Sequence, residues 1–135
     1  MKLRSKNGGS IEPFIVHLFK GGLIFESLLK KKYADTAEGN TLGSYLNEAL
    51  ADLELGTHPI YRRRSSYTLS DVINLLPVWN SESFQEKAVA VAYTIRNTTG
   101  HDLAWPDQFN INIYDEIFES LLNAILWVIW KLEVS

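Results

Sequence analysis

The sequence predicts an all-α fold: a bundle of about five helices with an up-and-down core and a long apolar C-terminal helix. Apolar residues recur at helical spacing along most of the chain. Residues that favour helix starts stand just before several of these stretches. The segment 113–132 is apolar on nearly every turn and is long enough for a helix of about six turns.

The length and composition predict one domain. The chain has 135 residues, of which 46% are hydrophobic, and this suits a single core. We expect a flexible N-terminus at 1–10 and one helical domain at 11–135. A formal charge of -3 gives no overall basic field, so any contact with nucleic acid would need a local patch. The absence of cysteine excludes disulfides and thiolate zinc sites and favours a reducing, cytoplasmic location.

Neither a secretory signal nor a membrane span is predicted. The first nine residues are polar and basic, and no uninterrupted apolar segment with a small-residue cleavage site follows them. The segment 113–132 contains Asp115, Glu116 and Glu119, whereas a membrane span needs about 18 residues with few charges. We therefore expect no membrane partner.

The first expected helix contains two adjacent glycines. Its apolar positions are Ile15, Leu18, Phe19, Phe25 and Leu29, and it ends in three lysines, which suit a helix C-terminus. Gly21 and Gly22 each cost about 1 kcal/mol in a helix interior. They therefore indicate either a kink or a place where another helix packs closely.

The three middle helices have recognisable starts. Thr41 is placed as the N-cap of a helix that Gly56 would stop. Thr68, with an acid three residues later, forms a capping-box pattern for a short helix that ends near Pro77. Ser83 begins a second such pattern, before a helix that leads directly to position 96. One face of that helix is expected to carry Phe84, Ala88, Val91, Ala92 and Ile95.

The last helix is expected to begin after Asn112 and to run to about Leu132. Its main apolar stripe consists of Tyr114, Phe118, Leu121, Leu122, Ile125, Val128, Ile129 and Leu132. Four further apolar residues lie outside the stripe: Ile117, Leu126, Trp127 and Trp130. A helix that is apolar on both faces either lies at the centre of a bundle or forms a subunit interface.

One short stretch, Arg96-Asn97-Thr98-Thr99-Gly100-His101, could carry chemistry. In a continuous helix Arg96 and His101 would lie about 140° apart around the axis and would not meet. The two threonines are poor helix formers and Gly100 suits a left-handed C-terminal cap, so the helix is expected to end there and let His101 fold back. A guanidinium binds phosphate and an imidazole moves protons near neutral pH, which together suit phosphodiester cleavage.

This stretch resembles the Arg-x4-6-His element of HEPN domains, in which it is often Arg-Asn-x-x-x-His and lies between the penultimate and final helices. The segments 19–29 and 101–105 look most like the HEPN halves of CRISPR-associated type III ancillary ribonucleases. The resemblance could span nearly the whole chain, but only the six-residue motif is diagnostic. On this resemblance, the expected fold is a HEPN-like bundle.

The resemblance implies an endoribonuclease that cleaves single-stranded RNA, needs no metal or cofactor, and serves CRISPR-linked or other antiviral defence. Two motifs would meet across a homodimer to form one composite site. Arg96 would stabilise the charge of the phosphorane, Asn97 would orient the pair, and His101 would position or transfer protons.

The chain departs from these relatives in two respects. The ancillary ribonucleases usually carry a Rossmann-like sensor domain for a cyclic oligonucleotide, and no alternating strand and helix region is present here. We expect a stand-alone domain or a fragment, with any regulatory sensor supplied by a partner. HEPN toxins often have a tyrosine two residues after the histidine, where this chain has Leu103.

Other interpretations of the charged residues stay open. Arg96 and His101 could simply be cations at a helix end, in a non-catalytic helical module for RNA binding or protein assembly. The run Arg62-Arg63-Arg64, between two tyrosines, could follow an RNA backbone or form a solvated loop.

Asp115 and Glu119 suit the start of a helix better than they suit glycoside chemistry. We expect His17 in the core or at its edge, and no histidine has the spacing of a known metal site.

Overall fold

The computed structural model describes residues 8–55, 68–98 and 111–134. These parts form five α-helices and contain no β-strand: α1 (Gly8–Tyr33), α2 (Leu42–Ala49), α3 (Leu69–Trp79), α4 (Phe84–Arg96) and α5 (Ile111–Leu132). The predicted all-α class and the number of helices are confirmed for the described ranges. None of these helices is both long enough and apolar enough to cross a membrane.

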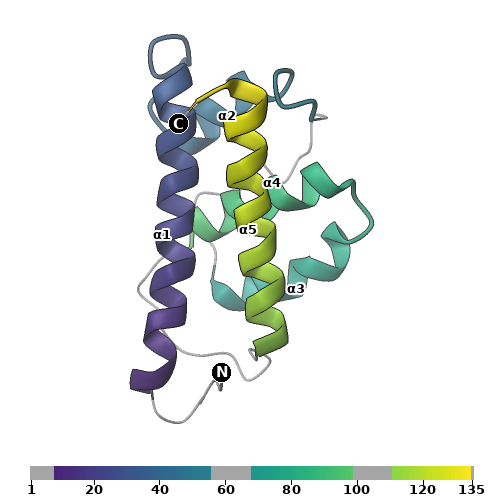
Figure 1. Ribbon diagram of the computed structural model, residues 1–135. Coiled ribbons are helices and arrows are strands. Elements are labelled where there is room, and N and C mark those ends of the chain that lie inside the picture. Colours follow the sequence, from purple (N-terminus) through teal and green to yellow (C-terminus); the bar gives the residue numbers. More distant parts are fainter. Residues whose placement is uncertain (1–7, 56–67, 99–110, 135) are drawn as a thin grey trace.

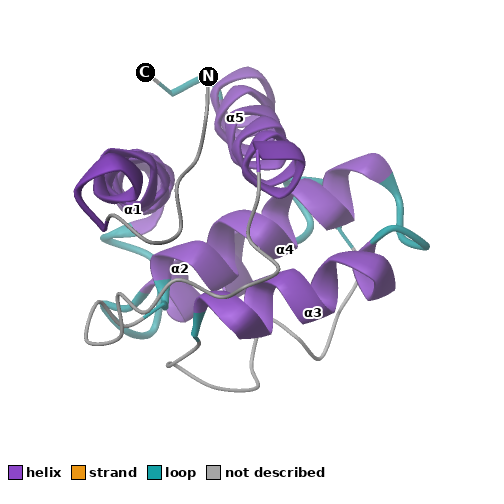
Figure 2. Ribbon diagram, turned by 90° about the horizontal axis from the view of Figure 1, so that it is seen from below, coloured by secondary structure: helices purple, strands orange, loops and turns teal. Residues whose placement is uncertain are grey.

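The helices are arranged in two directions. α1 and α5 lie side by side and run the same way, whereas α3 and α4 lie across them (Figures 1 and 2). α4 packs against α1, α3 and α5, and α2 packs against α1. The expected up-and-down core therefore describes only part of the arrangement. The two longest helices, α1 and α5, are parallel, and α3 and α4 lie across their direction.

α4 lies at the centre of the bundle. All eight residues from Ala88 to Ile95 are buried, so no side of this stretch faces solvent. Three of them are alanines, at alternating positions 88, 90 and 92, and their small side chains let neighbouring helices approach closely. The sequence interpretation considered the last helix for the central place, but the structure gives this place to α4.

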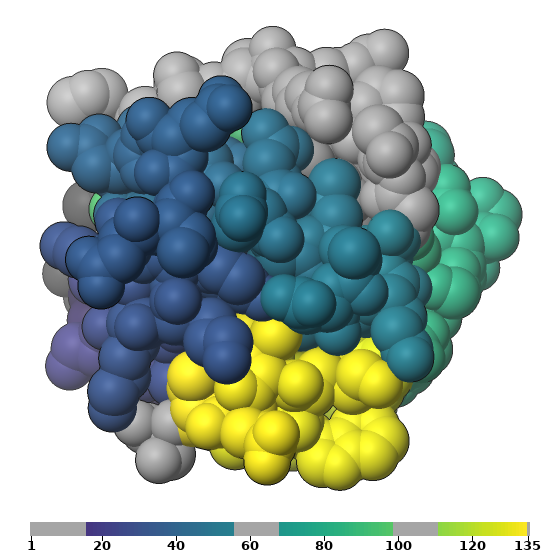
Figure 3. Space-filling view, turned by 90° about the horizontal axis from the view of Figure 1, so that it is seen from above, coloured from purple at the N-terminus to yellow at the C-terminus, as the bar shows by residue number. Residues whose placement is uncertain are grey.

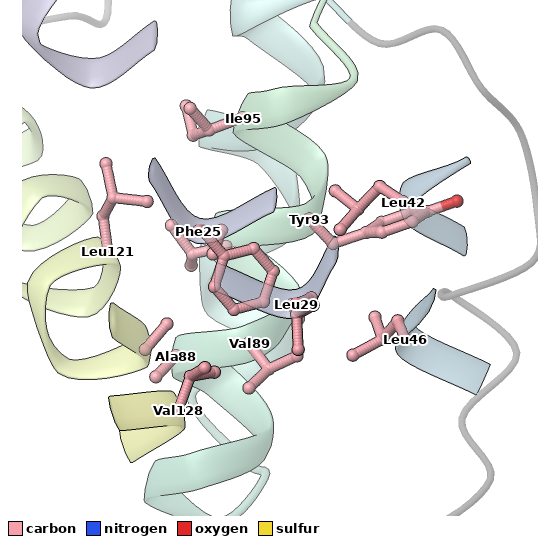
Figure 4. Packing of buried hydrophobic residues seen from close by; sticks show 14 of the residues in the cluster. Phe25, Leu29, Leu42, Leu46, Ala88, Val89, Tyr93, Ile95, Leu121 and Val128 are labelled. Atoms are coloured by element: carbon pink, nitrogen blue, oxygen red, sulfur yellow. The ribbon is translucent and has the colours of Figure 1, made fainter. Parts of the chain in front are cut away.

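The apolar core is built around the middle of α1. Phe25 and Leu29 are completely buried between α5, α4 and α2 (Figure 4). Leu121 of α5 and Leu46 of α2 contribute to the same cluster from opposite sides. Full burial of one such side chain contributes about 1.5–3 kcal/mol, so this contact region is a main source of stability.

The two glycines of α1 mark close packing, and the helix continues through both of them. A Cβ atom on Gly21 would overlap a methyl carbon of Leu121 in α5. A Cβ atom on Gly22 would lie 3.0 Å from the Cα atom of Arg96 in α4. Of the two expectations for this pair, close packing is confirmed, and each glycine serves a different neighbouring helix.

The predicted starts of the three middle helices are confirmed. Thr41 and Ser83 accept hydrogen bonds from backbone N–H groups three residues later, at distances of 3.2 Å each. Thr68 and Asp71 form a complete capping box, in which each side chain accepts from the backbone N–H of the other residue. α3 continues for two residues beyond Pro77 and ends at Trp79.

α2 ends earlier than expected. Its last residue is Ala49, and the chain then turns through Glu54, which has a left-handed φ of 61°, so the stop does not depend on Gly56. The C-terminal end of α5 lies against this turn (Figure 3). Trp127 donates its indole N–H to the Leu53 carbonyl at 2.9 Å, and Lys131 forms an ion pair with Glu54 at 3.0 Å.

α5 begins at Ile111, two residues earlier than expected, and ends at Leu132 as predicted. Its buried apolar stripe consists of Tyr114, Ile117, Leu121, Ala124, Val128 and Leu132. The stripe proposed from the sequence was wrong in part, because Ile117 is fully buried whereas Phe118 and Leu122 are more than 40% exposed. The exposed apolar residues of α5 are spaced four apart: Phe118, Leu122, Leu126 and Trp130. We call these four residues the α5 stripe.

Candidate functional site

The predicted motif begins at the end of the central helix. Arg96 is the last residue of α4, and Asn97 is its C-cap, with φ of −91° and ψ of 7°. The helix thus ends four residues before Gly100, the residue that was expected to stop it. Gly100 and His101 lie outside the described residues, so the distance between Arg96 and His101 stays a prediction.

The side chains after Arg96 bind the carbonyl groups of the last helical turn. The Asn97 side-chain amide donates to the Tyr93 carbonyl oxygen at 3.1 Å. The Thr98 hydroxyl donates to the Thr94 carbonyl oxygen at 2.8 Å. The Tyr93 carbonyl also accepts from the backbone N–H of Asn97, so the Asn97 side chain adds a second bond at this helix end, while the Thr98 hydroxyl supplies a partner for the Thr94 carbonyl. The amide of Asn97 therefore serves the helix end.

The Arg96 side chain is held by a carboxylate from α1. Its Nε–H donates to Glu26 Oε1 at 2.8 Å, across 70 positions of sequence. The two side chains are 35% and 23% exposed, so the pair lies at the edge of the core and is still accessible to solvent. A guanidinium has five N–H donors, and this contact engages the one on Nε. Within the described residues, the four N–H donors on the two terminal nitrogens have no other acceptor.

One turn of α1 contacts both the backbone and the side chain of Arg96. Gly22 lies against the Arg96 backbone, and Glu26 stands four residues later on the same face of the helix. The missing side chain at position 22 lets α1 approach the end of α4, and the carboxylate at position 26 then reaches the guanidinium. The contact thus depends on both residues.

Sequence reasoning missed Glu26 as a site residue. The signal was an isolated acid in the mostly apolar stretch 23–29, four residues after a glycine that indicated close packing. A carboxylate that is largely removed from solvent usually has a partner. Periodicity could not identify that partner, because Arg96 belongs to a helix that crosses α1 from far along the chain.

The other polar candidates do not gather into a second site. Asp115 and Glu119 are exposed on the N-terminal half of α5, and His17 is exposed on α1, so the expectation of a core or edge position for His17 was wrong. Arg62, Arg63 and Arg64 lie outside the described residues. In the ranges that are described, no group of three or more His, Asp or Glu side chains is placed to hold a metal ion.

A second ion pair joins α4 to α5. Lys87 Nζ lies 2.9 Å from Glu116 Oε2, and the two side chains are 23% and 32% exposed. A small hollow beside the pair is lined by Phe84 and Asn123, among others. Phe84 is 62% exposed, so its predicted place on the apolar face of α4 was wrong. The Lys87–Glu116 pair resembles the Arg96–Glu26 pair in length and exposure, and both cations come from α4.

The sequence matches no protein-family model, no curated protein and no solved structure. The described parts define an all-α protein in which an arginine at the end of a central helix is held by an acid from a crossing helix. The resemblance to HEPN domains rests on the motif residues and on their place between α4 and α5.

Proposed function

We propose that this chain is a HEPN-type, metal-independent endoribonuclease that cleaves single-stranded RNA, with Arg96, Asn97 and His101 in a composite site formed by two copies. The observation that carries the proposal is the place of Arg96. It is the terminal residue of α4, it is partly exposed, and the donors on its terminal guanidinium nitrogens have no acceptor among the residues that the structure describes. An anion could therefore reach it without opening the core.

The chemistry requires no group beyond the side chains and the RNA. The 2′-oxygen attacks the adjacent phosphorus, the bond from phosphorus to the 5′-oxygen breaks, and a 2′,3′-cyclic phosphate and a 5′-hydroxyl result. The proton lost by the 2′-hydroxyl is balanced by the proton that the leaving 5′-oxygen gains. The positive guanidinium of Arg96 stabilises the doubly charged phosphorane, and His101 serves the proton transfers.

Exposed apolar surface on α5 supports pairing with a second copy. Leu122, Leu126 and Trp130 are 42%, 54% and 69% exposed, and no charged residue occurs between positions 120 and 130. An apolar surface of this kind is typical of interaction sites. In a two-fold dimer the same stripe would meet its own copy, and each protomer would supply half of the active site. A role in CRISPR-linked or other antiviral defence, with a sensor supplied by a partner, belongs to the same proposal.

Cleavage of labelled single-stranded RNA in EDTA tests the proposed function. We expect the wild-type protein to produce fragments with cyclic phosphate ends. Arg96→Ala and His101→Ala should each reduce the rate by about 100-fold or more, because each removes a group that acts in the transition state. Lys87→Ala is the matched control, since it removes a paired cation from the same helix away from the motif.

Two results would contradict the proposal. Equal cleavage by wild type and Arg96→Ala would assign the activity to something other than the motif. Intact RNA with every folded variant would instead favour a non-catalytic helical module, in which Arg96 and Glu26 act only as an ion pair between helices. Circular dichroism and thermal unfolding of each variant show whether it is folded.

A further inference from the structure

The guanidinium of Arg96 has two edges that could bind a phosphate through two hydrogen bonds. One edge combines Nε with a terminal nitrogen, and the other combines the two terminal nitrogens. Glu26 Oε1 accepts from Nε at 2.8 Å, so the first edge is occupied in the folded chain. A phosphate that binds both donors of one edge would then use the two terminal nitrogens.

The carboxylate also restricts the movement of the side chain. Arginine has four rotatable side-chain bonds and loses about 2 kcal/mol of rotamer entropy when it is held in one conformation. In this chain Gly22 brings α1 against the Arg96 backbone, and Glu26 holds Nε one turn later. The backbone and the guanidinium of Arg96 are thus both held in place by α1 before RNA binds.

We infer that Glu26 is the positioning residue of the site: it binds Arg96 Nε and leaves the two terminal nitrogens of the guanidinium to bind the RNA phosphodiester. This inference rests on the proposed function and adds to it a residue from α1, outside the motif. Glu26 need not touch the RNA, because it acts through Arg96. Its effect on the rate comes from orientation, and a displacement of about 1 Å can change a rate by about 100-fold.

The test compares two ion pairs of similar geometry on the same helix. Glu26→Ala frees Arg96, whereas Glu116→Ala frees Lys87. We expect Glu26→Ala to lower kcat for RNA cleavage by 10- to 100-fold with a smaller change in KM. Glu26→Gln keeps an acceptor for Nε and should recover part of the loss. Glu116→Ala should leave kcat within about twofold of wild type. It should lower thermal stability to a similar extent as Glu26→Ala does.

A charge exchange separates positioning from simple pairing. The double variant Glu26→Arg with Arg96→Glu restores an ion pair between α1 and α4 but puts the guanidinium on the wrong helix. We expect it to regain thermal stability relative to Glu26→Arg alone and to stay inactive. If Glu26→Ala is folded and keeps wild-type kcat while Arg96→Ala has lost it, the inference is overturned and the proposed function stands.

A binding assay covers the case in which no chain cleaves RNA, which would overturn the proposed function. The same variants are then titrated with 2′-O-methyl single-stranded RNA, which lacks the attacking hydroxyl. Weaker binding by Arg96→Ala and by Glu26→Ala, but not by Glu116→Ala, supports the orientation of Arg96 toward phosphate. Equal binding by wild type and these three variants, or no binding by any of the four proteins, overturns the inferred orientation of Arg96.

Discussion

Gly22 determines how closely α1 approaches the end of α4. Its missing side chain leaves room for the Arg96 backbone, which cannot move away as a flexible side chain could. The situation at Gly21 differs, because the nearest atoms there belong to the Leu121 side chain. At the scale of single residues, Gly22 is therefore the stricter requirement of the two.

Substitution of Gly22 by alanine is expected to destabilise the fold. On an exposed helix this change would stabilise by about 1 kcal/mol, because alanine favours the helix. Here the new Cβ atom would lie 3.0 Å from Arg96 Cα, so the two helices must separate, and we expect a net loss of about 1–3 kcal/mol. Urea unfolding measures the effect, with Ser27→Ala as a control on an exposed position of α1. A stabilised Gly22→Ala protein would contradict the close contact.

At the scale of elements, the C-terminal end of α1 is tied to the turn that follows α2. The Tyr33 hydroxyl donates to Asp52 Oδ2 at 2.6 Å, and the tyrosine is only 5% exposed. Burial raises the pKa of Tyr33 well above its ordinary value near 10, and the hydrogen bond and negative charge of Asp52 raise it further. The folded chain therefore favours the protonated phenol.

This coupling predicts a loss of stability at alkaline pH. Below pH 10 the phenol is protonated in both states, and Tyr33→Phe should lower the free energy of unfolding by about 1 kcal/mol through the lost hydrogen bond. Above pH 10 the unfolded chain loses its proton first, so the advantage of wild type over Tyr33→Phe should shrink by up to about 1.4 kcal/mol per pH unit. Urea unfolding of both proteins from pH 8 to 11 measures it. A constant difference across this range would show that folding does not change the pKa of Tyr33.

At the scale of the whole molecule, the described helices leave the α5 stripe without a neighbour. α4 is surrounded by three helices, whereas α5 buries one side and exposes the α5 stripe on the other. Lys131 lies 5.4 Å from the ring centres of both Trp127 and Trp130 and carries the one positive charge near the C-terminal end of this surface within α5. Burial of such a stripe against a second copy would remove it from water.

Charged substitutions in the α5 stripe are expected to weaken a dimer without unfolding the protomer. Leu122→Lys combined with Leu126→Lys places two like charges on the surface that would meet its own copy, and both side chains are already about half exposed. Sedimentation equilibrium should show a shift from dimer to monomer, and RNA cleavage should fall with the dimer fraction. Val78→Lys, on an exposed position of α3, serves as control. A wild-type protein that is monomeric, or a double variant that still dimerises, would contradict this use of the stripe.

Local sequence signals were sufficient for much of the fold. The starts at Thr41, Thr68 and Ser83 were predictable because a capping side chain binds a backbone N–H only three residues away. The end of α5 at Leu132 was predictable from its apolar period. The exposure of Phe118 and Phe84 was not predictable. A pattern of apolar residues shows that a helix has a buried face, but it does not show how much of that face the neighbouring helices cover.

The sequence by itself determined the helical class, the starts of the three middle helices and the place of the motif at the end of the penultimate helix. These features depend on contacts between residues close together in the chain. Only the tertiary structure decided that α4 is central, that α5 keeps one apolar side exposed, and that Glu26 holds Arg96. Those features depend on helix crossings that join positions 70 residues apart, and no local pattern encodes the angle at which two helices cross.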